Sequence, residues 1–418
     1  MTPDLRRWAT PLFSTVALLV ARVASVPAIA DPTGAPLPRG LALSTPWPHV
    51  AAAPLFTLWD GMSMLSMSRL ESCVLGMAGL YVLWRVIRWW QHRRVMRELG
   101  YAALALVGFA LFILAGAIWH RPMVSLTGVP GGMVAVDFHS HSNASHDVKG
   151  ITRNWDVQAV RRWHARAGFD AFFLTDHNTQ NTDSRQSPPG APYVCPGIEV
   201  SAWRAHVVLL GTSEVVDRGP YAQSLDGVLA LLRDASAKFG AISIASIPEY
   251  ERNHWDHLES WVAAGLGGFE IVNASPKANE LARPRRDSVI ALARRTDRIV
   301  VGVSDQHGWG ATSMVWNLVS VSDGSARSGD PCAAILGRLT NSGFRAVRVV
   351  DRHRLRADSV WPAWLTAIGL VWETWRAMSW PLVVGWLAWI WLGAALAVRF
   401  GRGRSLVPTQ GESPELAV

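Results

Sequence analysis

Charged residues and cysteines are scarce in this chain of 418 residues. Asp, Glu, Lys and Arg together make up 17% of it, whereas hydrophobic residues make up 50%, and there are 22 tryptophans. This balance is too apolar for an ordinary soluble enzyme, and tryptophan favours the membrane interface, so the composition predicts contact with a lipid bilayer. Three cysteines are too few for a disulfide framework. Cys73 falls within an apolar segment, and Cys195 and Cys332 could pair if their domain is exported.

The net charge of +8 suits either nucleic acid or a membrane as the partner. We favour the membrane, because the basic residues cluster beside apolar segments, where they can orient helices in the bilayer. The sequence has no stripe of interleaved aromatic and basic residues, so no nucleic-acid partner is expected.

Four apolar segments are candidate membrane helices: residues 9–30, 72–90, 101–119 and 380–398. The segment 101–119 carries no charge and is the clearest of them. The segment 9–30 follows Arg6 and Arg7, and it fits either a cleaved signal peptide or a retained first helix. Residues 32–54 are rich in proline without periodicity, which predicts a loop.

Basic residues indicate how these helices are oriented. The run 91–98 joins two apolar segments, and RFGRGR follows the last one. The positive-inside rule places both in the cytoplasm. Four helices with both termini in the cytoplasm satisfy these clusters and leave the segment from Arg121 onward outside, at the cell (inner) membrane. Tryptophans on one face of residues 361–376 predict a helix in the membrane interface or, equally, one packed on the soluble domain.

Short apolar strands alternate with helical stretches between the membrane segments. This order indicates an α/β fold with a largely parallel sheet. Asn154 is expected to cap one helix and Ser224 another. The predicted division of the chain is an N-terminal membrane region (1–120), a catalytic domain (121–356), an interfacial amphipathic helix (357–378) and a C-terminal membrane helix with a basic tail (379–418).

Titratable side chains recur where the predicted strands end. A short apolar run, 134–136, leads to Asp137, His139 and His141. The two histidines differ by two positions, so they point to the same side of a strand and can bind one metal ion. The loops after the predicted strands carry His146, Asp147, Asp176, His177, Asp305 and His307, while Glu199 lies within a third strand and His206 opens a fourth. Barrel enzymes assemble a site in this way from separate pieces of chain.

Five motifs in order, DFHSHSNAS, FLTDHNT, GIEVS, HVVLLG and VSDQH, resemble the PHP (polymerase and histidinol phosphatase) family. The resemblance covers about residues 133–350. It implies a distorted (β/α)7 TIM-like barrel, here flanked by transmembrane helices, with two or three divalent metal ions and hydrolysis of phosphoesters. Some relatives hydrolyse other esters. Imidazole and carboxylate ligands suit zinc, manganese or iron, and calcium less well.

The resemblance also implies a role for each residue of the site. His139, His141, Glu199 and Asp305 are similar to one metal shell. Glu199 is expected to bridge to a second metal, which His206 also binds. A third shell would consist of His177, His307 and either His146 or Asp147. Asp137 and Asp176 adjoin ligands and could orient imidazoles, although Asp176 could equally cap a turn.

One departure from the family pattern concerns the second metal. The family has histidine immediately before a proline, and here Ile247 precedes Pro248. An isoleucine cannot bind a metal, so Glu249 or His254 would have to replace the ligand, or the second site would be weak. Arg204 and Arg252 are the best placed to hold an anionic substrate, and each is otherwise a plain surface charge.

These observations predict a membrane-anchored, metal-dependent hydrolase, most simply a phosphoesterase, with its site outside the cytoplasm. Its partners would be the bilayer and an anionic ester, which is lipid-linked, envelope-derived or a soluble ester captured near the membrane. The alternative is a non-catalytic sensor or scaffold with a degenerate metal site, because the histidine before Pro248 is missing.

Overall fold

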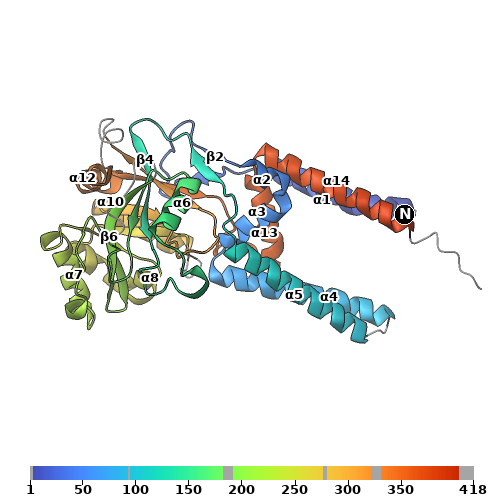
Figure 1. Cartoon of the computed structure of the whole chain (residues 1–418), viewed down its shortest axis with the longest axis horizontal. Helices are drawn as coiled ribbons and strands as arrows, with labels where there is room; N and C mark the ends of the chain where they lie inside the picture. Colours follow the sequence, from blue (N-terminus) through green and yellow to red (C-terminus); the bar gives the residue numbers. More distant parts are fainter. Residues whose placement is uncertain (1–2, 93–94, 182–191, 276–279, 322–330, 404–418) are drawn as a thin grey trace, which may run out of the picture.

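The computed structural model describes residues 3–92, 95–181, 192–275, 280–321 and 331–403. A curled sheet with surrounding helices forms one part of the molecule, and long apolar helices extend from one side of it (Figure 1). The strands are β1 (Ile29–Ala30), β2 (Ala42–Ser44), β3 (Ser125–Thr127), β4 (Met133–Ser140), β5 (Ala171–Leu174), β6 (Tyr193–Ala202), β7 (Ala205–Leu210), β8 (Ile242–Ala245), β9 (Gly268–Asn273), β10 (Ile299–Val303), β11 (Val315–Ser320) and β12 (Val347–Arg352). The helices are α1 (Pro3–Val23), α2 (Trp47–Ala51), α3 (Ala53–Ser63), α4 (Met67–His92), α5 (Val95–Ile118), α6 (Val157–Ala167), α7 (Leu225–Ala237), α8 (Glu249–Asn253), α9 (Leu258–Ala263), α10 (Arg283–Arg295), α12 (Pro331–Ser342), α13 (Thr366–Ala377) and α14 (Trp380–Gly403).

Ten strands form one sheet in the order β1-β12-β11-β4-β5-β6-β7-β8-β9-β10. The β4–β5–β6 and β8–β9–β10 neighbours are parallel, whereas β6–β7, β7–β8 and the β4–β11–β12 neighbours are antiparallel. The expected α/β class is confirmed, but the sheet is mixed rather than largely parallel. For β6 and β7 the reason is a short hairpin, because the two residues between these strands leave no room for a crossover helix.

The sheet curls until its last strand approaches β4. The backbone N–H of Asp305, just after β10, donates to the carbonyl of His139 at 2.9 Å, and that of His141 donates to the carbonyl of Gln306 at 3.1 Å. The result is a barrel-like α/β fold. The sevenfold repeat of the PHP type stays a prediction.

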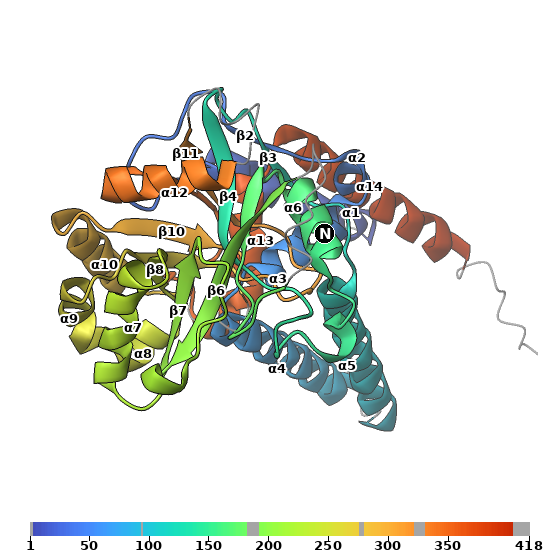
Figure 2. The same cartoon turned by 60° about the vertical axis from the view of Figure 1, so that its left-hand side comes forward.

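Helices α7, α8, α9, α10 and α12 lie along the outside of this curl (Figure 2). Ser224 caps α7 as expected, because its hydroxyl accepts a hydrogen bond from the Gly227 N–H. The cap of α6 is Asp156, which accepts from the Ala159 N–H at 2.7 Å, so the expectation for Asn154 was wrong by two residues. Cys195 of β6 and Cys332 of α12 form a disulfide that ties one helix to the sheet.

The long helices form two arms. Helices α1 and α14 lie side by side in one arm, and α4 and α5 form the other (Figure 1). Three of them contain segments long and apolar enough to cross a membrane: Met67–Ile87, Met96–Ile118 and Trp380–Arg399. In α1 the apolar stretch is shorter, Trp8–Val23. The start of α1, the end of α4, the start of α5 and the end of α14 all lie at the end of the arms far from the sheet (Figure 1).

The segment 32–54 is not only a loop, as its composition suggested. It contains β2, which pairs with β3, and α2, and it leads directly into α3. These elements escaped notice because two or three extended residues show no periodicity.

Helix α13 packs against α1, α3 and α4 of the membrane region. Within it Thr366, Gly369 and Leu370 are buried, while Ile368 remains exposed.

A buried cluster of charges joins the arms to the sheet. The carboxylate of Asp60 in α3 lies 2.7 Å from Arg121, which follows α5, and 3.3 Å from Arg352 at the end of β12. Arg121 also donates to the carbonyl of Gly310 at 2.7 Å, in the loop after β10. A carboxylate buried to this degree is stable only with such partners. The cluster therefore fixes the membrane helices against a loop that continues from the candidate site.

Candidate metal centre

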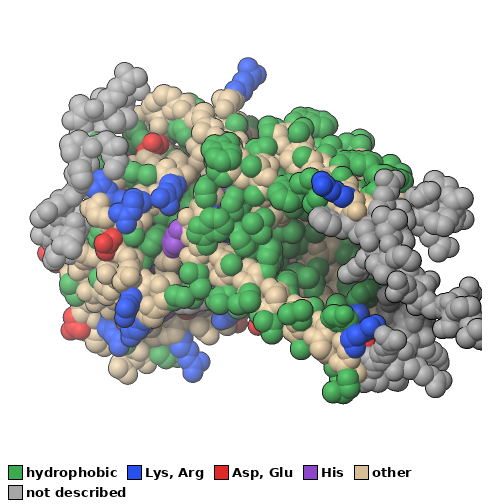
Figure 3. Space-filling model, turned by 45° about the vertical axis from the view of Figure 1, so that its right-hand side comes forward, with side chains coloured by type: hydrophobic (Ala, Val, Ile, Leu, Met, Phe, Trp, Pro, Cys, Tyr) green, Lys and Arg blue, Asp and Glu red, His purple; other side chains and the backbone are tan. Residues whose placement is uncertain are grey.

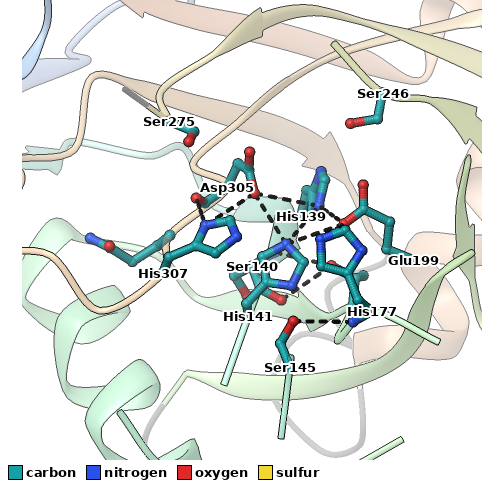
Figure 4. A network of polar contacts seen from close by, with 12 residues as sticks. His139, Ser140, His141, Ser145, His177, Glu199, Ser246, Ser275, Asp305 and His307 are labelled. Atoms are coloured by element: carbon teal, nitrogen blue, oxygen red, sulfur yellow. Dashed lines mark hydrogen bonds and ion pairs between the residues drawn. The ribbon is translucent and has the colours of Figure 1, made fainter. Parts of the chain in front are cut away.

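Histidines and carboxylates from β4, β5, β6, β7, β10 and the loops that follow them meet in one cluster, part of which is drawn in Figure 4. Among the described residues, three overlapping groups have ligand atoms close enough to hold a metal ion. The groups are His139, His141 and Glu199; His177, Glu199 and His206; and His141, Asp147, His177 and His307. Of the ligands predicted from the sequence, all except His146 and Asp305 belong to one of these groups.

The first group is centred on the end of β4. Nε2 of His139 lies 2.9 Å from Nε2 of His141 and 3.0 Å from Oε2 of Glu199. Asp305 joins them, since its Oδ1 lies 3.1 Å from Nε2 of His141. Asp305 has a φ of 45°, a left-handed conformation that is uncommon for residues other than glycine and is typical of functional sites.

Glu199 links the first group to the second. Its Oε2 lies near His139 and His141 and 3.1 Å from Nε2 of His177, whereas its Oε1 lies 3.3 Å from Nδ1 of His206. The side chain of Glu199 is only 2% exposed, while that of His206 is 32% exposed. A carboxylate with its two oxygens in different groups has the geometry of a bridging ligand.

The third group lies on the other side of His141. Nε2 of His307 is 2.7 Å from Oδ2 of Asp147, and Nε2 of His177 is 3.4 Å from the same oxygen. Asp147, rather than His146, supplies the donor from this loop. The imidazole of His146 is exposed and touches the group only through a ring contact with His177, at 4.9 Å between centroids.

In two imidazoles, those of His307 and His139, the hydrogen bond made by Nδ1 indicates what Nε2 of the same ring can bind. Nδ1 of His307 lies 2.7 Å from the carbonyl oxygen of Asp305, which can only accept, so Nδ1 donates. In the neutral ring, Nε2 then directs a lone pair at the Asp147 carboxylate. Two acceptors at hydrogen-bond distance need a cation or a proton between them. The donor set therefore fits divalent metal ions.

His139 shows the same pattern, and it uses a residue that the sequence analysis missed. Nδ1 of His139 donates to Oε1 of Glu270 at 2.7 Å, which leaves Nε2 for the group around Glu199. Glu270 in β9 is fully buried and also accepts from the Ile247 backbone N–H at 2.9 Å and from Nδ2 of Asn273 at 3.1 Å. Such a carboxylate fixes the orientation of a metal-binding imidazole. The sequence offered one indication of Glu270: it is a glutamate inside an apolar strand, and a charged side chain is rarely buried there without a partner.

Protons balance the charge of this centre when no metal is bound. Burial opposes ionisation of Glu199 and Asp305, but the neighbouring imidazoles, above all that of His139, hold the pKa of both carboxyls below the usual range. Burial would lower the pKa of His206, yet the Glu199 carboxylate raises it to about 9. Burial and the charge of His307 lower the pKa of His141 to about 3. Divalent ions would replace the bound protons.

The gap at Ile247 has a neighbour that can fill it. Oε1 of Glu249 lies 3.7 Å from Nδ1 of His206, and its Oε2 is buried without a hydrogen-bond partner among the described residues. His254, the other residue considered, is turned away, because its Nε2 donates to the carbonyls of Trp203 and Arg204. Of the two, only Glu249 is placed to complete the group around His206.

Asp137 and Asp176 do not orient metal-binding imidazoles, so that expectation is corrected. Asp137 accepts from the backbone N–H and hydroxyl of Ser304 and lies 2.9 Å from Nε2 of His164. It thereby holds the start of the loop that carries Asp305. Asp176 accepts from the Ser142 N–H at 2.6 Å and from its hydroxyl at 2.7 Å, which is the turn-stabilising alternative.

Arg204 and Arg252 are both exposed. The guanidinium of Arg204 lies over the ring of Trp203, with 5.3 Å between its carbon and the ring centroid. Arg204 lies at the tip of the β6–β7 hairpin, next to β7, which carries His206. Arg252 lies in α8, the helix that also carries Glu249. Their role in holding an anion stays a prediction.

Comparison with protein-family models and with curated protein sequences gives no match. Two solved structures show limited similarity. An amidohydrolase from Chromobacterium violaceum, with bound sulfate and no metal, is 16% identical over 41% of this chain and 87% of its own, with a TM-score of 0.28. PsfC from Pseudomonas syringae PB-5123 is 16% identical over 57% of this chain and 96% of its own, with a TM-score of 0.37. Both TM-scores are too low for either likeness to decide fold or function.

Proposed function

We propose that this protein is a membrane-anchored, metal-dependent hydrolase of the PHP type that cleaves phosphoesters. The observation that carries the proposal is the arrangement of lone pairs. Imidazole nitrogens and carboxylate oxygens lie within 4.8 Å of one another in three groups, and His141, His177 and Glu199 each belong to two of these groups. Divalent ions bound there would supply hydroxide at neutral pH and would hold the oxygens of the ester.

The side chains of the chain itself would position these ions. Glu199 would bridge two of them, His139 would be fixed in its tautomer by Glu270, and Glu249 would complete the group around His206. Zinc, manganese or iron suits this mixture of nitrogen and oxygen donors. The choice of phosphoesters over other esters rests on the resemblance of the five motifs to the PHP family.

The position outside the cytoplasm is also part of the proposal, with the cell (inner) membrane as the location. The Cys195–Cys332 disulfide supports it, because such bonds persist in oxidising compartments. The arms support it as well, since the ends richest in basic residues lie far from the sheet, and such ends stay in the cytoplasm.

A sensor or scaffold without catalysis is the alternative, and Ile247 is the observation that favours it. A site that has lost a ligand would bind fewer ions and would turn over nothing. Glu249 weighs against this alternative, because it offers a replacement oxygen beside His206.

Hydrolysis by the purified full chain tests the proposal. The protein in detergent, loaded with Mn²⁺ or Zn²⁺, would be given bis(4-nitrophenyl) phosphate, 4-nitrophenyl phosphate and 4-nitrophenyl acetate. We expect metal-dependent cleavage of at least one phosphoester, which Glu199→Gln abolishes. Cleavage of the acetate alone would overturn the choice of phosphoesters, and cleavage of none by a metal-loaded protein would favour the sensor.

A further inference from the structure

One cavity connects the candidate metal centre to the membrane helices. It has a volume of about 370 Å³. At one end it is lined by Ser304, Asp305 and His307. At the other end it is lined by Leu70 of α4 and Ile113 of α5. Two parts of the molecule that the sequence places far apart therefore share one internal space.

Apolar side chains form most of the wall between these ends. Trp59, Met62 and Leu65, which lie in α3 and just after it, are part of this wall. The indole N–H of Trp59 donates to the carbonyl of Phe112 at 2.9 Å. The polar atom of this side chain is therefore paired, and its ring presents an apolar surface to the cavity. A cavity of this size holds a small organic molecule, and an apolar wall binds hydrocarbon rather than a hydrated anion.

We propose that the substrate is a membrane amphiphile, with its phosphoester group at the metal centre and a hydrocarbon chain in this cavity. The proposal rests on the hydrolase function proposed above. The chain would enter from the side of α4 and α5, whose lipid-facing segments border the cavity. Apolar side chains cover both arms where they leave the sheet (Figure 3).

A second side of the centre is open to water. The side chain of Asp147 is 22% exposed and that of His206 is 32% exposed, and neither lines the cavity. The headgroup can thus reach the centre with one side toward water while the hydrocarbon stays in the apolar space.

Hydrolysis would form a bond from a water oxygen to phosphorus and break one ester P–O bond. The leaving oxygen would keep the electron pair and take up the proton that the water loses.

Photo-crosslinking tests the binding mode without any turnover. The probe is a single-chain alkyl phosphate that carries a diazirine on the chain, added to the full protein in nanodiscs. We expect labelled peptides to include Trp59–Leu70 of the cavity wall and the part of α5 around Ile113. Labelling there should fall at least fivefold in Ile113→Trp, which fills the cavity. Leu114→Trp is the matched control, because Leu114 is 51% exposed and does not line the cavity.

Chain-length dependence provides the second test. In the metal-loaded protein, kcat/KM for octyl 4-nitrophenyl phosphate should exceed that for the methyl ester by at least about tenfold, as burial of a few methylenes provides. This ratio should fall toward one in Ile113→Trp and in a second cavity variant, Leu70→Trp, and should persist in Leu114→Trp. Metal content would show that each variant has folded.

The outcomes separate this inference from the proposed function. If the methyl and octyl esters are cleaved equally well, or if labelling is the same in Ile113→Trp as in the natural protein, the amphiphile proposal is wrong and the hydrolase stands. If no ester is cleaved but the labelling follows the cavity, the chain binds a membrane amphiphile and the hydrolase proposal fails.

Discussion

Oε1 of Glu249 lies 3.7 Å from Nδ1 of His206, beside the position where Ile247 leaves the metal centre without a histidine. The backbone N–H of Ile247 instead donates to Glu270, which holds His139. This segment thus orients one group of the candidate centre through Glu270 and brings the carboxylate of Glu249 close to another.

Replacement of Glu249 should remove one metal ion. We expect Glu249→Gln to lower the metal content by about one ion per chain, because His206 has the carboxylates of Glu199 and Glu249 beside it and the substitution removes the charge of one of them. Elemental analysis of the purified variant measures this. Glu251→Gln is the control, since Glu251 lies on the same short helix and pairs with Arg285. Equal metal content in both variants would show that Glu249 binds nothing.

Glu270 should act through His139. In Glu270→Gln the shape of the side chain is kept, but the charge that makes His139 a better ligand is lost. Changes of this kind weaken metal affinity by about 10–100-fold. Competition with a chelator measures the affinity, and unchanged affinity would mean that Glu270 serves only to fill the core.

Metal affinity should fall as the pH falls. The Glu199 carboxylate raises the pKa of His206 to about 9 in the metal-free centre, against the effect of burial, so this imidazole is protonated at pH 7. Because a metal binds only the neutral ring, binding must displace that proton, and affinity should drop about tenfold per pH unit for each proton displaced. Calorimetry at pH 7 in buffers of different ionisation enthalpy should show at least one proton released per chain. No release would contradict the charge balance described above.

The buried charges at the junction should matter for stability. Asp60→Asn would leave Arg121 without its charged partner inside the protein, which costs about 3–5 kcal/mol. Thermal unfolding in detergent measures the effect, with the exposed Asp226→Asn as the control. Similar melting temperatures for the two variants would mean that the cluster contributes little.

Several of the candidate ligands could be located from the sequence, because His139, His177 and Asp305 lie at or just after the end of a recognisable apolar run. His139 and His141 are close at the end of β4, with 2.9 Å between their Nε2 atoms, as their spacing predicts. Glu270 could not be paired with His139 in advance, since 131 residues separate them and only the curl of the sheet brings them together. Strand β11 was overlooked because Asn317 interrupts its apolar run. That side chain is buried and bonds to the backbones of β4 and β10.

The long apolar helices were predicted in outline for a similar reason. Length and lack of charge identify α4, α5 and α14 without any knowledge of the fold. The position of α3 between the arm and the sheet depends on Asp60 meeting Arg121 and Arg352, and no local pattern encodes that contact. The cavity, which this contact helps to frame, was therefore not visible in the sequence.

The disulfide provides a test of location. If the domain lies outside the cytoplasm, Cys195 and Cys332 should be oxidised in cells, while Cys73 of α4 stays free. Denatured protein from intact cells should react with a polyethylene glycol maleimide at one cysteine before reduction and at three after it. Three reactive cysteines without reduction would place the domain in a reducing compartment.

The central claim is that the cluster around Glu199 holds metal, and elemental analysis of the full chain tests it most directly. The protein would be expressed with Zn²⁺, Mn²⁺ and Fe²⁺ supplied, purified without chelators and counted for ions per chain, beside Glu199→Gln as the matched variant. We predict two or three ions in the natural chain and at least one fewer in the variant. A natural chain that carries no ion would contradict the account.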